Sequence, residues 1–570
     1  MKKESIPTAA GTFCASFILV VFFFVLLPAL VVATPSLADE SGISPASAVP
    51  AQLVPLPKRF LPRVYGDAII RGTIGEASNL LPFLSTDSGS AEVAELIFVR
   101  LLRYSKDLVV EPWAAESYEV LDGGLRLRFT LRPGIRWFDG KEMTAEDVEF
   151  TYKMMIDPKT PTAYGSDFKA ISSFTVTGRY TFEVSYDEPY VRSLGTWLRQ
   201  AIQPKHILEG EDLRETQYAR NPVGNGPYRL KEWKAGSRVI LEANPDYFEG
   251  RPGIDRVVFS TIPDLTTMFL ELKAGAVDMM GLTPQQYVFQ SKDPTVAGNF
   301  NQFRFLSFSY TYLGYNLESP LFKDVRVRRA IAHAIDKKTI VAGALTGQGE
   351  PTIGPYVPGT WAYNTSIKDY PTDLDVARKL LAEAGWIKDR DGILRNRRGQ
   401  RFAFSIMTNQ GNEQRIKAAV VIQSQLKPLG MDVSIRTVEW ATFFSQFVNK
   451  GFFDAVILGW TTPLDPDLYD VWHSSRRRPD GLNFMMYKND EVDELIIKAR
   501  KTFEQAGRKQ YYDRIQELLH EDQPYCFLYV PYALPVVHKR FHGLAIAPAG
   551  ITYNFIDWWA PKEHWRYMAQ

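Results

Sequence analysis

The pattern of hydrophobic residues predicts that strands and helices alternate over most of the chain. Residues 125–132 alternate apolar and polar side chains, which is typical of a strand with one solvated face. Thr144 followed by Asp147 forms a capping-box pattern, so a helix is expected over residues 145–156. The apolar positions of the predicted strand are Leu125, Leu127, Phe129 and Leu131.

The second half of the chain has a regular rhythm of strands and helices. A strand is expected over residues 310–316 and a helix over residues 325–341. This alternation indicates an α/β lobe rich in parallel strands. The further elements expected are helices over 371–384, 413–427, 440–449, 491–503 and 508–521, and strands over 402–407, 431–438 and 453–458.

The stretch FDAVILGWTTPLDPDLYD, residues 453–470, combines an apolar strand with a stiff acidic loop. Residues 453–458 suit a strand that is buried on both faces of a parallel sheet. Pro463 and Pro466 fix φ and remove two backbone donors, so the loop has few conformations. Open α/β sheets bind ligands at loops that follow the carboxyl ends of their strands. The loop after Trp460 is therefore a candidate binding element.

Composition and charge narrow the classes of partner. The chain has 570 residues, a length that favours two or three domains, and 13% of them are aromatic. Lys and Arg total 66 and Asp and Glu total 65. Such an even balance leaves no electrostatic footprint for nucleic acid or an anionic membrane surface. We therefore expect a small or neutral partner and no nucleic acid.

The start of the chain predicts secretion. Lys2 and Lys3 precede an apolar run over residues 17–33, and residues 36–38 fit a small-x-small cleavage site, so residues 1–38 are expected to be a signal peptide. An uncleaved anchor is the alternative, because this run reaches the short end of a membrane span. Residues 39–64, rich in Pro, Ala and Ser, are expected to form a flexible linker.

Motifs of common enzyme classes are absent from the sequence. It has no G-x-S-x-G elbow, no phosphate-binding G-x-x-x-x-G-K-[ST] loop and no H-E-x-x-H pair. Asp465, Asp467 and Asp470 begin like a calcium loop, but Tyr469 and Asp470 stand where a further ligand and a glycine are needed. We therefore expect no cofactor and no metal.

Six stretches within residues 131–470 occur in an order that is typical of one protein family. Five of them are LRPGIRWFDGKEMTAEDVEFTYKMM (131–155), NPVGNGPYRLKEW (221–233), ANPDYFEGRPGID (243–255), LGYNLESPLFKDVRVRRAIAHAIDKKTIV (313–341) and YPTDLDVARKLLAEAGW (370–386), and the sixth is the loop after Trp460. In this order they resemble the extracellular solute-binding proteins of family 5. These are the peptide-, nickel- and oligosaccharide-binding receptors of ABC importers.

The resemblance implies a fold and a mode of action. The fold class would be α/β, with the two-lobed, type II (Venus-flytrap) architecture of periplasmic binding proteins and an extra β-rich subdomain in the first lobe. Lobe I would span residues 65–306 and lobe II residues 307–527, with residues 528–570 returning to lobe I. The lobes would close on a solute by a hinge motion, and a membrane permease would recognise the closed form.

A peptide ligand sets a charge requirement for the site. Its two ends are charged, and enclosing each charge costs several kcal/mol unless the charge is paired. Peptide-binding relatives take the amine with an Asp three positions after the loop tryptophan, where this chain has Pro463. Either Asp465 supplies the acid from a shifted position, or the site does not require a free amine. Helix capping is the alternative role for Asp465 and Asp467.

The candidate binding residues come from both predicted lobes. Arg415 is the candidate for the ligand carboxylate, with a plain surface arginine as the alternative. Ser88 and Gly89 could offer main-chain groups, or could simply begin a helix. Tyr310 and Tyr312 are candidates against a core role. Together with the loop, the full set is Trp460, Thr461, Asp465, Arg415, Ser88, Gly89, Tyr310 and Tyr312.

These observations lead to one functional hypothesis and two alternatives. We expect a monomeric periplasmic binding protein that delivers a peptide-like solute to the permease of an ABC transporter and performs no chemistry. One alternative is a receptor for a nickel chelate, haem or an oligosaccharide. The other is a secreted hydrolase that uses Ser88 or Ser90, for which the sequence indicates no base.

Overall fold

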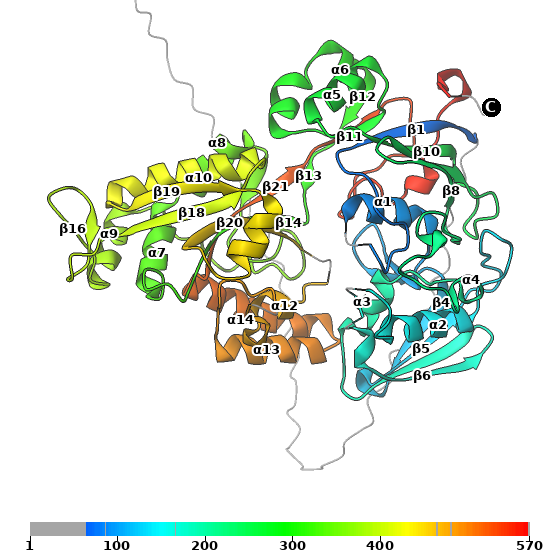
Figure 1. The fold of residues 1–570 in the computed structure, drawn as a ribbon, viewed down its shortest axis with the longest axis horizontal. Helices are drawn as coiled ribbons and strands as arrows, with labels where there is room; N and C mark the ends of the chain where they lie inside the picture. Colours follow the sequence, from blue (N-terminus) through cyan, green and yellow to red (C-terminus); the bar gives the residue numbers. More distant parts are fainter. Residues whose placement is uncertain are drawn as a thin grey trace, which may run out of the picture. The chain divides into compact units, whose positions relative to one another are not determined.

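The computed structural model describes residues 64–567, except 86, 163, 166, 463–464 and 479–480 (Figure 1). The predicted signal peptide and almost all of the predicted linker lie outside these residues, as does Pro463. In the described part of the chain, no helix has both the length and the apolar character needed to cross a membrane.

A seven-stranded sheet organises the part of the chain that we call lobe I. Strand β1 runs parallel to β10 and to β11. All the other neighbouring pairs of strands in this sheet are antiparallel. The spatial order is β12 (Phe300–Gln302), β22 (Pro535–His538), β11 (Met279–Gly281), β1 (Gly66–Thr73), β10 (Ile254–Thr261), β9 (Arg238–Ala243) and β8 (Tyr228–Lys234). Helices of this lobe include α1 (Ser88–Ile97), α3 (Arg192–Arg199), α4 (Lys205–Leu208), α5 (Leu265–Ala274) and α6 (Pro294–Asn299).

Lobe I also carries a separate antiparallel sheet in the order β4-β5-β7-β6, from β4 (Ala115–Leu121), β5 (Arg126–Leu131), β7 (Thr181–Tyr186) and β6 (Ile171–Gly178). The predicted strand is confirmed over Arg126–Leu131, where Leu127, Phe129 and Leu131 are buried and the intervening residues are half-exposed. Leu125 was wrongly placed on the same face, because it precedes the strand and is 36% exposed. A short pair, β2 (Leu102–Tyr104) and β3 (Val110–Pro112), precedes this sheet.

The predicted capping box is also confirmed. Helix α2 spans Ala145–Ile156, and the Asp147 carboxylate accepts the Thr144 N–H at 2.8 Å. The bond satisfies a donor that has no partner inside the helix. The start of α2 is therefore fixed by the two residues that predicted it.

A second sheet organises lobe II. Its strands follow the order β13 (Phe305–Leu306), β21 (Tyr525–Ala533), β14 (Ser309–Tyr315), β20 (Ala455–Thr461), β18 (Ala403–Asn409) and β19 (Asp432–Val438), and β15 (Gly349–Pro351) pairs with β21. Strand β18 is parallel to β19 and β20, but β14 is antiparallel to β20 and β21. The sheet is mixed, so the expectation of a parallel setting for residues 453–458 is correct on one side only.

Strand β20 is buried on both faces, as its sequence predicted. Ala455 and Ile457 belong to one hydrophobic core of lobe II, and Val456 and Leu458 belong to the other. The helices of this lobe are α7 (Val325–Ala334), α8 (Lys337–Leu345), α9 (Leu374–Glu383), α10 (Glu413–Leu426), α11 (Trp440–Thr442), α12 (Tyr469–Trp472), α13 (Asp490–Lys501) and α14 (Gln505–Asp522).

Two predicted helices differ from the structure. The single helix expected over residues 325–341 is two helices, because Ile335 is extended and the Asp336 carboxylate caps α8 by accepting the Lys338 N–H at 3.0 Å. The helix expected over residues 440–449 is a short α-helical turn that continues as a π-helix over Phe443–Val448. Periodicity alone did not reveal the aspartate that interrupts the first.

Buried charges join the chain's return strand to the start of lobe I. Arg540 follows β22, and its Nη2 donates to Asp278 at 2.7 Å and to the Ala68 carbonyl at 2.8 Å. Asp278 also accepts the Ile70 N–H of β1 at 2.9 Å, and Asp67 pairs with Arg540 as well. The predicted lobe boundaries remain a prediction, but these contacts tie residues separated by most of the chain into one unit.

Candidate functional site

Trp460 and Thr461 form the carboxyl end of β20. The strand continues past the predicted end at residue 458, and Trp460 lies opposite Tyr310 of β14. The Trp460 ring is half-buried and stacks on Phe484, with 5.8 Å between ring centroids and 11° between planes. Thr461 is exposed. The strand end thus offers a flat aromatic side chain next to an accessible hydroxyl.

The two candidate tyrosines lie in the core of lobe II. Tyr310 is 3% exposed and Tyr312 is fully buried. The Tyr312 ring stacks on Tyr525 at 3.8 Å, and Trp460 Nε1 donates to the Tyr525 hydroxyl at 3.4 Å. Burial raises the pKa of both Tyr310 and Tyr312 well above its usual value. The structure therefore connects them to Trp460 as supports from within the core, and a contact with ligand stays a prediction.

Arg415 lies in the first turn of α10, against the end of β20. The Asn412 side chain caps the helix by accepting the Arg415 N–H at 3.0 Å, and Arg415 Nη1 donates to Asn409 Oδ1 at 2.9 Å. Burial lowers the pKa of Arg415. A Cβ at Gly459 would lie 3.1 Å from Arg415 Nη2, so the glycine leaves room for the guanidinium. Within the described residues no carboxylate pairs with Arg415.

Asp465 is engaged by an arginine of lobe II. Arg508 Nη2 donates to its two carboxylate oxygens at 2.9 and 3.1 Å, and also to the Tyr512 hydroxyl at 2.8 Å. Burial lowers the pKa of Arg508, but Asp465 and Tyr512 raise it by more, so that the net shift is upward. The predicted role of Asp465 as partner of a ligand amine is untested, and a ligand amine would compete with Arg508 for it.

Asp467 connects lobe II with lobe I. It accepts a hydrogen bond from Arg192 of α3 at 3.0 Å and pairs with Arg500 of α13 at 3.1 Å. Arg192 also donates to Asp167 at 3.0 Å. Asp467 accepts the Tyr469 N–H at 3.2 Å as well, so it serves the turn that leads into α12. The predicted helix cap is not formed, because the N-cap residue of α12 is Leu468, which has no side-chain cap bond, and no backbone N–H of the described residues donates to Asp465. Two arginines that sequence reasoning missed, Arg192 and Arg500, pair with the Asp467 carboxylate.

Ser88 and Gly89 begin α1 in lobe I. Asp87 caps the helix by accepting the Ser90 N–H at 2.7 Å. A Cβ on Gly89 would lie 3.1 Å from the Glu76 carbonyl, so the glycine permits close packing of two backbone segments. Ser88 is exposed, and the first N–H groups of a helix have no intrahelical acceptor. Among the described residues, no hydrogen bond or ion pair joins Ser88 or Gly89 to residues 460–470.

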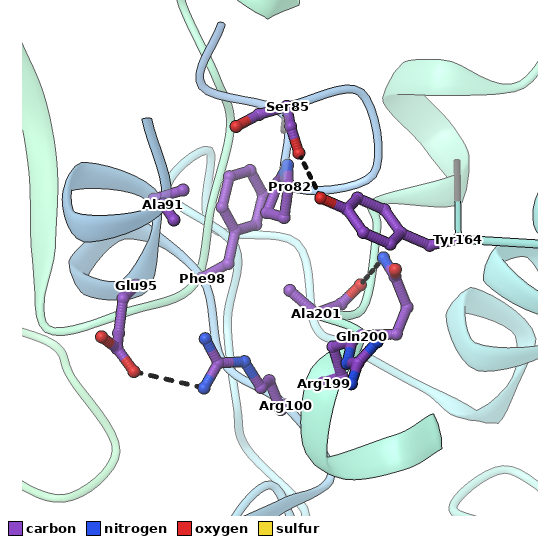
Figure 2. Close-up of a pocket in the computed structure, with 11 residues that line it drawn as sticks. Pro82, Ser85, Ala91, Glu95, Phe98, Arg100, Tyr164, Arg199, Gln200 and Ala201 are labelled. Carbon is purple, nitrogen blue, oxygen red and sulfur yellow. Dashed lines mark hydrogen bonds and ion pairs between the residues drawn. The ribbon is translucent and has the colours of Figure 1, made fainter. Parts of the chain in front are cut away.

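A cavity of about 300 Å³ lies beside α1 in lobe I (Figure 2). Its wall is partly apolar, from Phe98 and small residues. Arg100 on the wall pairs with Glu95 at 3.3 Å, and the Tyr164 hydroxyl donates to the Ser85 carbonyl at 2.9 Å. Arg199, which is exposed, has no ion-pair partner among the described residues. The lining residues are Pro82, Ser85, Ala91, Ala94, Glu95, Phe98, Arg100, Tyr164, Arg199, Gln200 and Ala201.

Tyr104 of β2 relates this cavity to the acidic loop of lobe II. Burial raises the pKa of its hydroxyl and Asp465 raises it further, while Arg199 and Arg508 lower it. Charged groups influence a titration in this way only when they are near. The Arg199 side chain on the cavity wall and the Asp465–Arg508 pair therefore act on the same hydroxyl.

Comparison with known proteins decides the family. The sequence profile of the bacterial extracellular solute-binding proteins, family 5 (middle region), matches residues 109–480. The chain belongs to family 5 of the extracellular solute-binding proteins. This family 5 protein is 37% identical over 527 residues to the oligopeptide-binding protein AppA of Bacillus subtilis, covering 88% of its own chain and 93% of AppA.

Solved structures agree with that assignment. The structure of B. subtilis AppA in complex with a nonapeptide matches with a TM-score of 0.75 at 35% identity, covering 88% of this family 5 chain and all of AppA. Campylobacter jejuni NikZ in complex with Ni(L-His) matches with a TM-score of 0.75 at 28% identity, covering 86% of this chain and 99% of NikZ. The predicted two-lobed α/β fold of periplasmic binding proteins is therefore confirmed.

The site of this family 5 protein lacks the parts of a serine hydrolase in the region described. Ser90 Oγ accepts the Ser78 N–H at 2.8 Å and donates to Asp87 at 2.7 Å, and no histidine contacts Ser88 or Ser90 by a hydrogen bond in the described residues. A serine nucleophile needs a base within hydrogen-bond reach. Nor do the described His, Cys, Asp and Glu side chains form a group of three that could hold a metal ion.

Proposed function

We propose that the protein is the substrate-binding component of an ABC importer and captures peptides for delivery to a membrane permease. It works in the periplasm as a monomer, after export by its signal peptide. The lobes close on the solute, which neutralises the solute's charges and presents the closed form to the permease. The protein releases the solute chemically unchanged.

The proposal rests mainly on the environment of Arg415. Its guanidinium is largely withdrawn from water, is oriented by Asn409 and has no carboxylate partner in the described chain. Leaving a charge in such a place is costly unless something pairs with it. A guanidinium matches a carboxylate with two parallel hydrogen bonds, so the carboxylate terminus of a peptide is the natural partner.

The surroundings of Arg415 suit the rest of a peptide. The Arg415 guanidinium lies against Gly459 on one face of β20, and the next residue, Trp460, stacks on Phe484 on the other face. Thr461 lies beyond them, and the exposed start of α1 at Ser88 and Gly89 can donate main-chain N–H groups from lobe I. Main-chain and aromatic contacts hold a peptide backbone without selecting its side chains.

A receptor for a metal chelate is the second candidate. Its support is the engagement of Asp465 by Arg508, which leaves a free amine without an evident acidic partner. Chelates such as the nickel–histidine complex of NikZ carry carboxylates that Arg415 could equally bind. A hydrolase is disfavoured because, among the described residues, no histidine forms a hydrogen bond with Ser88 or Ser90.

The test compares peptides with a free carboxylate and their C-terminal amides by isothermal titration calorimetry. The wild-type protein should bind the free acids at least tenfold more tightly, because a charged hydrogen bond contributes about 1.5–3 kcal/mol. Arg415→Gln should abolish that difference. Arg398→Gln, in an exposed turn of lobe II, is the matched control and should preserve it. Equal binding of acids and amides by the wild type would refute the assignment, and binding of chelates but no peptides would favour the second candidate.

A further inference from the structure

Four acids of the loop after Trp460 and of the cavity wall pair with arginines of the protein. Asp465 pairs with Arg508, and Asp467 pairs with Arg192 and Arg500. Asp470 lies 3.4 Å from Arg476 and 3.5 Å from Arg192. On the cavity wall of lobe I, Glu95 pairs with Arg100. None of these four carboxylates is left for a ligand cation without displacing an arginine.

The positive groups of the same regions are not matched in this way. Arg415 beside β20 and Arg199 on the cavity wall each lack a carboxylate partner among the described residues. Arg415 Nη2 lies against Gly459, the residue before Trp460, and Arg199 lines a cavity of about 300 Å³. The site therefore has two unmatched positive charges and no unmatched negative one among these residues.

The cavity has the size and lining of a side-chain pocket. Its volume is at the lower end of the range for small-molecule sites, too small for a whole oligopeptide but sufficient for one or two side chains. Phe98, Pro82 and three alanines give it apolar walls that fit a short aliphatic stem, and Arg199 provides a cation at its edge (Figure 2). Aspartate and glutamate side chains have this combination of an aliphatic stem and a terminal carboxylate.

We propose that the protein selects acidic peptides: one carboxylate of the solute pairs with Arg415 in lobe II and a second, from an Asp or Glu side chain, pairs with Arg199 in lobe I. A free amine on the solute is not required. This inference rests on the proposed peptide-binding function and names the substrate class within it. Two carboxylates held by two different lobes would also contribute to closure, because each lobe then gains from the same ligand.

Charge complementarity also gives the expected size of the selectivity. Replacing a carboxylate by an amide of nearly the same shape removes a charge-assisted hydrogen bond and leaves the arginine unpaired. The loss should be roughly 10- to 100-fold in affinity. Acetylation of the peptide amine should change affinity by less than about threefold, because the four carboxylates named above already pair with arginines.

The experiment uses the full mature protein and a series of alanine-based peptides in which one Glu occupies each position in turn. Each is matched by the same peptide with Gln, and by its N-acetylated form. The wild type should bind at least one Glu peptide roughly 10-fold or more tightly than its Gln counterpart, and Arg199→Gln should remove this preference, chiefly by weakening binding of the Glu peptide. Arg398→Gln should behave as the wild type.

Each outcome decides something. Equal binding of Glu and Gln peptides at every position would overturn the acidic preference and leave the proposed function standing. A preference that survives Arg199→Gln would overturn the assignment of Arg199. Arg199 ends α3, where a cation also stabilises a helix, so urea unfolding is measured on the same variants. A variant that loses stability and loses affinity for Glu and Gln peptides alike would show a structural role only. Failure to bind any peptide would refute the proposed function itself.

Discussion

Arg508 donates from one nitrogen to both carboxylate oxygens of Asp465, at 2.9 and 3.1 Å. The two residues lie 43 positions apart, and the arginine side chain is 9% exposed. The acid that sequence reasoning offered to a ligand amine is therefore already part of an ion pair inside lobe II. This relationship changes what a mutation at Asp465 is expected to do.

Asp465→Asn should lower the stability of the folded protein and should not change its selectivity for peptides with a free amine. The substitution leaves the buried Arg508 guanidinium without its anion, which we expect to lower the free energy of unfolding by about 1–3 kcal/mol. Any loss of peptide affinity should be equal for free-amine and N-acetylated peptides. Calorimetric titration of both peptide forms checks this, and a loss confined to the free-amine form would assign Asp465 to the amine after all.

Asp467→Asn should speed the release of ligand. Asp467 of lobe II accepts a hydrogen bond from Arg192 of lobe I at 3.0 Å, so the contact helps to hold the lobes in this arrangement. Its loss should raise the dissociation rate roughly 10-fold, as expected for one charged hydrogen bond. Stopped-flow fluorescence of bound peptide measures the rate. Glu188→Gln, which breaks the more exposed pair with Lys501, is the control and should leave the rate nearly unchanged, whereas equal rates for all three proteins would rule out this role.

Asp278→Asn should cause a large loss of stability. Asp278 is fully buried and pairs with Arg540, whose side chain is 2% exposed, so the variant leaves a buried guanidinium poorly compensated. Breaking such a pair typically costs about 3–5 kcal/mol. Urea unfolding measures the change, with Glu232→Gln as control because its pair with Arg238 is exposed and such pairs contribute at most about 1 kcal/mol. Similar losses for the two variants would contradict the importance of burial here.

His520 should make a contribution to stability that is lost in part as the pH is lowered from about 7 to about 5. Burial lowers the pKa of His520 to about 4, below the value of about 6.5 for an unfolded chain. The unfolded state therefore binds a proton first, and the stability contributed by neutral His520 is full above pH 6.5 and is lost toward pH 4.

For His520 alone the loss at pH 5 should be about 1–2 kcal/mol. His520→Phe retains a ring for stacking on Tyr370, whose ring centroid lies 4.5 Å away, and should lessen the pH dependence by that amount. Urea unfolding at several pH values gives the comparison. Burial also lowers the pKa of His538 to about 4 and raises the pKa of Asp278 to about 7, so the variant should retain opposing contributions from these two groups. An unchanged slope would contradict the assignment to His520.

Local patterns predicted the elements well because their causes are local. The alternation around Phe129 and the capping pair Thr144–Asp147 are properties of neighbouring residues, and both appear as expected. Burial of both faces of β20 was predicted from its apolar run. The break at Asp336 was missed because the apolar period continued across it, although the cap that causes it was visible in the sequence.

The residues of the site could be predicted only in part, because its ion pairs join residues that lie far apart in the sequence. Arg508 lies 43 positions from Asp465, and Arg192 lies 275 positions from Asp467. No periodicity carries such information, so sequence reasoning assigned the acids of the loop to a ligand amine or to a helix cap. Arg199 was missed for the converse reason: its significance lies in a cavity whose wall comes from several segments of lobe I.

The most direct test of the account is to denature the purified protein and identify by mass spectrometry the small molecules that it releases. A receptor of this kind retains part of its ligand, and the account predicts intact peptides enriched in aspartate and glutamate over the peptides of the surrounding medium. Recovery of non-peptide solutes alone, or of cleaved fragments that accumulate when peptides are added back, would contradict it.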